Sequence, residues 1–226
     1  MSRITDIINQ KDTRTAGNSI LLILVFIAVF IVPVFPLAFH KLLFNFFYTF
    51  IFFVAAFSLQ NYRQRILILA VAVTALEWIS SSLNMPILSG LSKILNMIFF
   101  MIIVVGLIIQ VARTKQVSVR VIMEAINGYL LLGMVFALLV AIIIAFQPEA
   151  YNFPTADSGL GESVSSFSDY LYYAFVTFTT VGYGDIVPKL PYAKSLAVLT
   201  GVTGQIYVAV IIAMLVGKFS STNTSD

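Results

Sequence analysis

Six long runs of apolar residues constrain the fold of this chain more than any other feature of its sequence. A bilayer core about 30 Å thick requires about 20 apolar residues in each crossing helix, and backbone groups inside that core must pair within the protein. We therefore expect an all-α membrane protein with six transmembrane helices, of which the second and third are short. The runs are Ser19–Phe39, Phe44–Leu59, Ile66–Ile79, Ile94–Ala112, Gly128–Phe146 and Ala193–Val216.

The composition agrees with a membrane protein and argues against several other classes. Of the 226 residues, 60% are hydrophobic and 10% are charged, whereas soluble domains have about 45–50% and about 25%. The net charge of +3 is too small for a nucleic-acid-binding protein. The chain has no cysteine and one histidine, His40, and no nucleophile–base or metal-binding group emerges from its sequence. We expect neither enzyme activity nor an organic cofactor.

The segment between the fifth and sixth runs differs from the rest of the chain. Gln147–Ser166 contains two prolines, two glycines and several acidic residues, which is typical of an exposed loop. Phe167–Thr180 is amphipathic and rich in aromatic residues, but it is too short to cross the membrane and return. We interpret it as a re-entrant half-helix.

Charged residues predict the orientation. Basic residues gather in short cytoplasmic loops, so we expect both termini in the cytoplasm of a multi-pass protein of the cell membrane. The nine on that side are Arg3, Lys11, Arg14, Arg63, Arg65, Arg113, Lys115, Arg120 and Lys218. Five acidic residues fall in the outer segment, where they would concentrate cations; they are Glu149, Asp157, Glu162, Asp169 and Asp185.

A distinctive sequence follows the half-helix directly. Thr179–Asp185 reads Thr-Thr-Val-Gly-Tyr-Gly-Asp. Irregular backbone is tolerated at membrane depth only where it lines a cavity or is buried in protein. Glycine adopts a positive φ without steric cost, so Gly182 and Gly184 can turn successive carbonyls to one side. An ordinary glycine turn between two helices is the disfavoured alternative. The carbonyls concerned are those of Thr180, Val181, Gly182 and Tyr183.

This motif resembles the selectivity filter of the potassium channel family. The resemblance is strongest over Phe167–Val216 and only general over the first four helices. It implies a homotetramer in the lipid bilayer around a central pore, with stacked oxygen rings that replace the hydration shell of K⁺. The Thr180 hydroxyl would supply the innermost ring, and the side chains of Val181 and Tyr183 would pack against the half-helix. The implied K⁺ ligands are Thr180, Val181, Gly182 and Tyr183, and Gly184 completes the filter.

The half-helix is expected to support the filter from behind. Tyr172 and Tyr173 occupy the places of a tryptophan pair in the family, and we predict that the Tyr172 hydroxyl reaches Asp185 or Tyr183. The partial negative charge at the C-terminal end of the half-helix favours a cation. The expected supporting residues are Tyr172, Tyr173, Thr177, Thr179 and Asp185.

The last helix is the expected inner helix of the pore. Gly204 falls where the family has its gating-hinge glycine, and a hinge is slightly favoured there over close helix packing. Packing is favoured for Gly201. The expected cavity residues below the filter are Gln205, Val208 and Ile212.

These assignments divide the chain into five parts. They are a cytoplasmic N-terminus (1–18), a four-helix domain resembling a voltage sensor (19–112), a cytoplasmic linker (113–127), a pore domain (128–218) and a C-terminal tail (219–226). Within the linker, apolar residues of Lys115–Ala125 recur at helical spacing. This stretch either lies along the inner membrane surface or starts the fifth helix early.

The fourth run contains no arginine or lysine. Voltage sensing requires such charges, because moving one charge through 100 mV is worth about 2.3 kcal/mol. Glu77 is an acid within the early spans, and it either lies at the outer interface or serves as a countercharge or proton site.

Together these features predict a potassium-selective channel that conducts passively and is not steeply voltage-gated. The alternative is a secondary cation transporter with an ion site near the middle of the membrane. Such a transporter would predict an inverted repeat, and none is evident in the sequence.

Overall fold

The computed structural model describes residues 15–58, 63–83, 86–114, 118–153 and 166–222. The first helical span is Thr15–Val34, and it ends in a π-helical turn, Ile27–Ile31, and a 3₁₀ turn, Val32–Val34. The longer helices are α2 (Leu37–Ser58), α3 (Arg63–Leu83), α4 (Pro86–Arg113), α5 (Val119–Phe146) and α7 (Pro191–Thr222). Two short elements, η3 (Pro148–Ala150) and α6 (Phe167–Phe178), lie between α5 and α7.

Five helices in the described part of the chain are long and apolar enough to cross a membrane. They are the first span, α2, α4, α5 and α7, in agreement with five of the six expected spans. Helix α3 has 21 residues, a length of about 31 Å, but it is not among the five. Its role as the sixth span therefore stays a prediction.

The boundary between the first two spans differs from the expected one. The run Ser19–Phe39 does not form one helix, because the first span ends at Val34 and α2 begins at Leu37. Pro33 and Pro36 explain the break, since proline lacks a backbone N–H and clashes with the preceding turn. Residues 37–43 consequently belong to α2.

The start of α5 decides between the two alternatives for Lys115–Ala125. Helix α5 begins at Val119 and continues without interruption to Phe146. The fifth helix therefore starts early, and the expected boundary between residues 127 and 128 falls inside it. Ser118 precedes the helix in an extended conformation.

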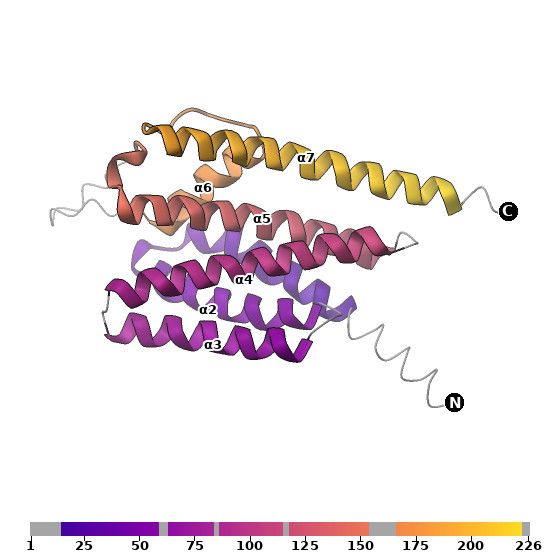
Figure 1. Cartoon of the computed structure of the whole chain (residues 1–226), viewed down its shortest axis with the longest axis horizontal. Coiled ribbons are helices and arrows are strands. Elements are labelled where there is room, and N and C mark those ends of the chain that lie inside the picture. Colours follow the sequence, from indigo (N-terminus) through magenta and orange to yellow (C-terminus); the bar gives the residue numbers. More distant parts are fainter. Residues whose placement is uncertain (1–14, 59–62, 84–85, 115–117, 154–165, 223–226) are drawn as a thin grey trace.

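The helices form one bundle in which α4 and α5 pack along each other (Figure 1). Helix α3 packs between α2 and α4, and α6 contacts both α5 and α7. Buried aromatic and aliphatic side chains fill the centre, among them Phe99 and Ile103 of α4 and Leu131 of α5. Many large apolar side chains remain exposed on the outer faces of the helices, as expected for a surface in contact with lipid.

The first two helices pack directly against α6 of the same chain. The Phe44 and Phe167 rings lie 5.0 Å apart, and those of Tyr48 and Phe167 lie 5.7 Å apart. The ring of Phe30, on the first span, lies 6.4 Å from the ring of Phe175. Within the chain, the early helices therefore contact α6 through these aromatic side chains.

A group of polar side chains around a buried carboxylate joins the first span, α4 and α5 at the end of the bundle far from α6. Glu124 is fully buried, and its Oε1 accepts hydrogen bonds from Asn18 Nδ2 at 2.9 Å and from Gln110 Nε2 at 2.6 Å. Arg120 Nε lies 3.4 Å from the same oxygen. We call these four residues the Glu124 cluster.

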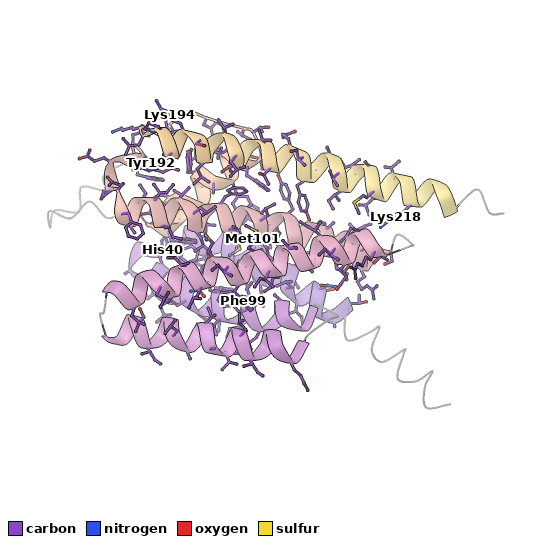
Figure 2. The ribbon with its side chains drawn as sticks, in the orientation of Figure 1. His40, Phe99, Met101, Tyr192, Lys194 and Lys218 are labelled. Carbon is purple, nitrogen blue, oxygen red and sulfur yellow. The ribbon has the colours of Figure 1, made fainter. Side chains whose placement is uncertain are left out.

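Lys218 links the end of α7 to the end of α4 beside this cluster (Figure 2). Its Nζ donates to the carbonyl oxygens of Val111 at 2.7 Å and Ala112 at 3.0 Å. The last carbonyls of a helix have no partner within that helix, and a cation at this end is favoured by the helix dipole. Arg113, Arg120 and Lys218 consequently gather at the same end of the bundle.

Candidate functional site

Helix α6 begins with a capping box. The Ser166 side chain caps the backbone at Asp169, and Asp169 Oδ2 accepts the Ser166 N–H at 2.8 Å. This arrangement satisfies donors that the first turn leaves open. The helix has 12 residues, or about 18 Å, which is too short to cross a bilayer. A short helix is therefore present at the expected place, and it ends two residues before the predicted Thr180.

The loop after α6 folds its N–H groups back onto the helix. The Thr179 N–H donates to Phe175 O at 2.9 Å, and the Thr180 N–H donates to Thr177 O at 3.0 Å. The next two N–H groups, of Val181 and Gly182, share the Val176 carbonyl. Within the described residues, no backbone N–H donates to a carbonyl of residues 180–184. The groups that this loop offers to a ligand are therefore oxygens.

Every second residue of the loop has a positive φ. The angles are +61° at Thr180, +57° at Gly182 and +80° at Gly184. The two glycines behave as expected, whereas a positive φ at Thr180 was not predicted. A β-branched residue there is strained, at a cost of about 1–3 kcal/mol. Alternating backbone handedness is the condition under which successive carbonyls can face one side.

Thr180 is held by hydrogen bonds on two sides. Its Oγ1 donates to the Thr179 carbonyl at 2.7 Å and accepts a hydrogen bond from Gln205 Nε2 at 3.1 Å. Gln205 thus lies beside Thr180 of the loop, and its place in a cavity stays a prediction. Val208 and Ile212 follow on α7 at helical spacing and are exposed in the single chain. Their role in a cavity stays a prediction.

Gly204 of α7 lies against the end of α6. A Cβ added there would overlap the carbonyl oxygen of Phe178 and would lie 2.9 Å from the Phe178 carbonyl carbon. A Cβ at Gly201 would meet only ordinary contacts, the nearest at 3.6 Å from Thr177 O. Close packing thus accounts for Gly204, where the sequence slightly favoured a hinge. A hinge at Gly204 stays a prediction.

Tyr172 reaches Asp185, as predicted. Its hydroxyl donates to Asp185 Oδ2 at 2.6 Å. This hydrogen bond holds the pKa of the Asp185 carboxyl below its ordinary value and raises the pKa of Tyr172 to about 12. The carboxylate and the neutral phenol therefore both persist at neutral pH.

The other supporting residues act at different places. Tyr173 is buried with Tyr151, their rings 5.0 Å apart, in an apolar cluster that includes Ile186. Thr179 Oγ1 donates to Phe175 O at 2.7 Å, and Thr177 contributes its backbone carbonyl to Thr180. These residues surround the base and the exit of the loop.

Val181 and Tyr183 do not pack as expected within one chain. Their side chains are 54% and 72% exposed in the single chain, so their packing against the half-helix stays a prediction. Exposure of these side chains is expected if their contacts belong to a neighbouring copy, which the single chain does not contain.

Sequence reasoning missed a segment that holds the exit of the loop. Asn152 Nδ2 donates to the Asp185 carbonyl at 3.4 Å, and Asn152 Oδ1 accepts the Val187 N–H at 2.5 Å. Two backbone hydrogen bonds join the same segments. The Asn152 N–H donates to Val187 O at 3.2 Å, and the Lys189 N–H donates to Ala150 O at 2.8 Å. These pairs flank a β-bridge between Tyr151 and Pro188. Composition alone predicted an exposed loop here, yet Ala150 and Tyr151 are buried.

The described residues contain no cluster of three or more His, Cys, Asp or Glu side chains suited to a metal ion. The oxygens that the loop can offer to a cation are backbone carbonyls and the Thr180 hydroxyl, which suit hard cations. Glu77 lies on α3, and its side chain is outside the described part of the structure.

Comparison with known proteins identifies the region around this loop. A family profile described as "Ion channel" matches residues 138–221. Three relatives are a two-pore potassium channel of Arabidopsis thaliana (33% identity, 37% of this chain, 29% of the relative), a voltage-gated potassium channel of Aeropyrum pernix (33%, 42% and 30%) and an A-type voltage-gated potassium channel of Homo sapiens (29%, 41% and 13%). The matches therefore span less than a third of each relative. No solved structure matches the chain at a significant level.

The matched residues include the second part of α5, all of α6, the Thr179–Asp185 loop and nearly all of α7. Residues 138–221 are thus similar to the ion channel family, and the relatives that match this part of the chain are potassium channels.

Proposed function

We propose that the protein is a potassium-selective channel in which the Thr179–Asp185 loop is the selectivity filter. The alternation of positive φ at Thr180, Gly182 and Gly184 carries this proposal, together with the loop carbonyls that no backbone N–H engages in the described residues. Rings of such carbonyls replace the hydration shell of K⁺. The K⁺ ligands are the backbone oxygens of Thr180, Val181, Gly182 and Tyr183 and the Thr180 hydroxyl.

The functional unit is a homotetramer. One loop offers its oxygens from one side only, so a ring around an ion requires further copies. The exposed side chains of Val181 and Tyr183 and the exposed apolar face of α7 support an interface between copies; the α7 residues include Val198, Val202, Ile206 and Ile212. Each subunit keeps its early helices on its own pore region, because α2 and the first span pack on α6 of the same chain.

The charge distribution suits cation entry from the outside. Arg113, Arg120 and Lys218 lie at one end of the bundle, which is the cytoplasmic end by the positive-inside rule. Both termini are then cytoplasmic. Asp169 and Asp185 lie at the other end, beside α6 and its loop. The C-terminal end of α6 directs its partial negative charge towards the loop.

Gating is not steeply dependent on voltage. Helix α4 carries Lys93 near its start and Arg113 at its end, with no basic residue between them. A charge must lie within the membrane to respond to the potential.

Ion flux from liposomes that contain the purified protein tests the proposal. We expect rapid K⁺ efflux down its gradient and far slower Na⁺ efflux in matched vesicles. Equal rates for the two ions would contradict the filter. Flux that requires a second, coupled ion would instead indicate the secondary transporter.

A further inference from the structure

We propose that Asn152 is a positioning residue that fixes the exit of the filter loop and thereby sets the spacing of its outer carbonyl rings. This inference rests on the proposed function. Asn152 lies on the segment after α5 and is 33 and 35 residues from its two side-chain partners. Neither α6 nor α7, the helices on either side of the loop, carries this residue.

The Asn152 side chain engages the loop exit through both ends of its amide. The amide nitrogen donates to the Asp185 carbonyl, and the amide oxygen accepts the Val187 N–H at 2.5 Å. These two backbone groups lie on consecutive peptide units of the segment that leaves the loop. An amide that satisfies a carbonyl and an N–H together fixes the direction of the backbone between them, here around Ile186.

Asn152 itself is held by backbone hydrogen bonds and by buried neighbouring residues. Its backbone N–H donates to Val187 O, and Ala150 O accepts the N–H of Lys189. Ala150 and Tyr151 are buried in the apolar cluster with Tyr173 of α6 and with Ile186, on the segment that leaves the loop. The segment can therefore transmit the position of α5 and α6 to the loop, rather than move with it.

The arrangement holds Asp185 from two directions. Tyr172 of α6 binds its carboxylate, and Asn152, on the segment before α6, binds its backbone carbonyl. Gly184, the residue before it, has a φ of +80°. Glycine has no side chain to keep it in that region, so the position of Gly184 depends on what holds its neighbours. Loss of Asn152 would release the outer part of the loop while the base at Thr180 remains held.

The test compares Asn152→Leu and Asn152→Asp with the unmodified channel in planar bilayers. Leucine has a similar size and makes neither hydrogen bond. Aspartate keeps an acceptor for the Val187 N–H and loses the donor to the Asp185 carbonyl. We measure the K⁺/Na⁺ permeability ratio and the decline of current at constant voltage, at low and at high external K⁺.

For Asn152→Leu we expect a permeability ratio lower by about fivefold, on the scale of one net hydrogen bond, and a faster decline of current. High external K⁺ should slow that decline, because K⁺ binds only the ordered filter and stabilises it by mass action. Asn152→Asp should fall between Asn152→Leu and the unmodified protein. The control is Asn45→Leu, the same exchange on α2, and it should behave as the unmodified protein.

Tetramer yield and melting temperature separate positioning from general stability. A selective unmodified channel together with unchanged ratio and time course in both Asn152 variants would overturn the inference. If Asn152→Leu does not form tetramers, Asn152→Asp alone is measured, and an unchanged permeability ratio and time course in that variant would overturn the inference. A lower melting temperature with an unchanged ratio and time course would also overturn it. Failure of the proposed function is distinguishable, since the unmodified protein would then lack K⁺ selectivity.

Discussion

The loop after α6 and the Glu124 cluster are two polar regions that differ in whether donors of the protein itself hydrogen-bond their oxygens. In the loop, the backbone N–H groups fold back on α6 and the carbonyls of residues 180–184 are left to a ligand. In the Glu124 cluster, a fully buried carboxylate is enclosed by Asn18, Gln110 and Arg120. A permeation site needs oxygens that an ion can use, whereas a structural junction needs oxygens that the protein has already satisfied.

The two regions also differ in how they obtain negative potential. The loop uses neutral carbonyl dipoles and the end of a helix, with the Asp185 carboxylate set to one side by Tyr172. The cluster uses a formal charge with a cation 3.4 Å away. Conduction requires that an ion can leave a site as well as enter it, and stacked rings of carbonyl dipoles meet this requirement in potassium channels.

The largest effect is expected from breaking the cluster. Glu124→Leu should destabilise the protein by about 3–5 kcal/mol, because it leaves Arg120, the buried amide of Asn18 and the partly buried amide of Gln110 without their common acceptor. Thermal unfolding in detergent measures this change. Glu149→Leu, at an exposed position of η3, is the matched control and should have little effect. Equal melting temperatures for the two variants would show that the cluster is not a structural junction.

The next effect is expected at the contact between α6 and α7. Gly204→Ala should destabilise the folded protein by about 3 kcal/mol, because the added methyl group overlaps the Phe178 backbone, which cannot move aside cheaply. Gly201→Ala lies one helical turn away and should be tolerated, since its nearest contact is at 3.6 Å. Size-exclusion chromatography and thermal melting compare the pair. If Gly204→Ala were as stable as Gly201→Ala, close packing would not account for this glycine.

A smaller effect is expected when pH changes at the loop exit. The Asp185 pKa is lowered, so its contribution to stability is complete above the ordinary value near 4 and is lost as pH falls through the lowered value. The Tyr172 pKa is raised to about 12, so its contribution is complete below about 10 and is lost as pH rises through the higher value. Selectivity should therefore stay constant from about pH 5 to about pH 9.

Tyr172→Phe removes the donor and tests the same contact. The Asp185 pKa should then rise towards its ordinary value, and loss of selectivity in acid should begin at a higher external pH than in the unmodified channel. Tyr192→Phe, on the exposed start of α7, is the control. An identical acid limit in the Tyr172→Phe and unmodified channels would mean that this hydrogen bond does not set the titration of Asp185.

The sequence predicted the features that depend on local pattern. Apolar length predicted six spans, of which five agree with the described helices; aromatic content and length predicted α6, and glycine spacing predicted the positive φ of Gly182 and Gly184. The Tyr172–Asp185 contact also followed from the family resemblance.

Features that depend on tertiary contacts were missed. Asn152 reaches residues 33 and 35 positions away, and Asn18 reaches Glu124 across 106 positions. No periodicity reports such pairs. The close contact at Gly204 likewise depends on where α6 ends against α7, and a glycine in a helix is compatible with either packing or a hinge.

The reversal potential under opposed K⁺ and Na⁺ gradients, measured for the unmodified channel and for Gly182→Ala, tests the central claim most directly. Gly182 has a φ of +57° and no atom within 4 Å of an added Cβ, so alanine changes the backbone conformation rather than the packing within the chain. We expect the unmodified channel to reverse near the K⁺ equilibrium potential and Gly182→Ala to lose this selectivity. A K⁺-selective reversal potential in Gly182→Ala would contradict selection by backbone carbonyls of this loop.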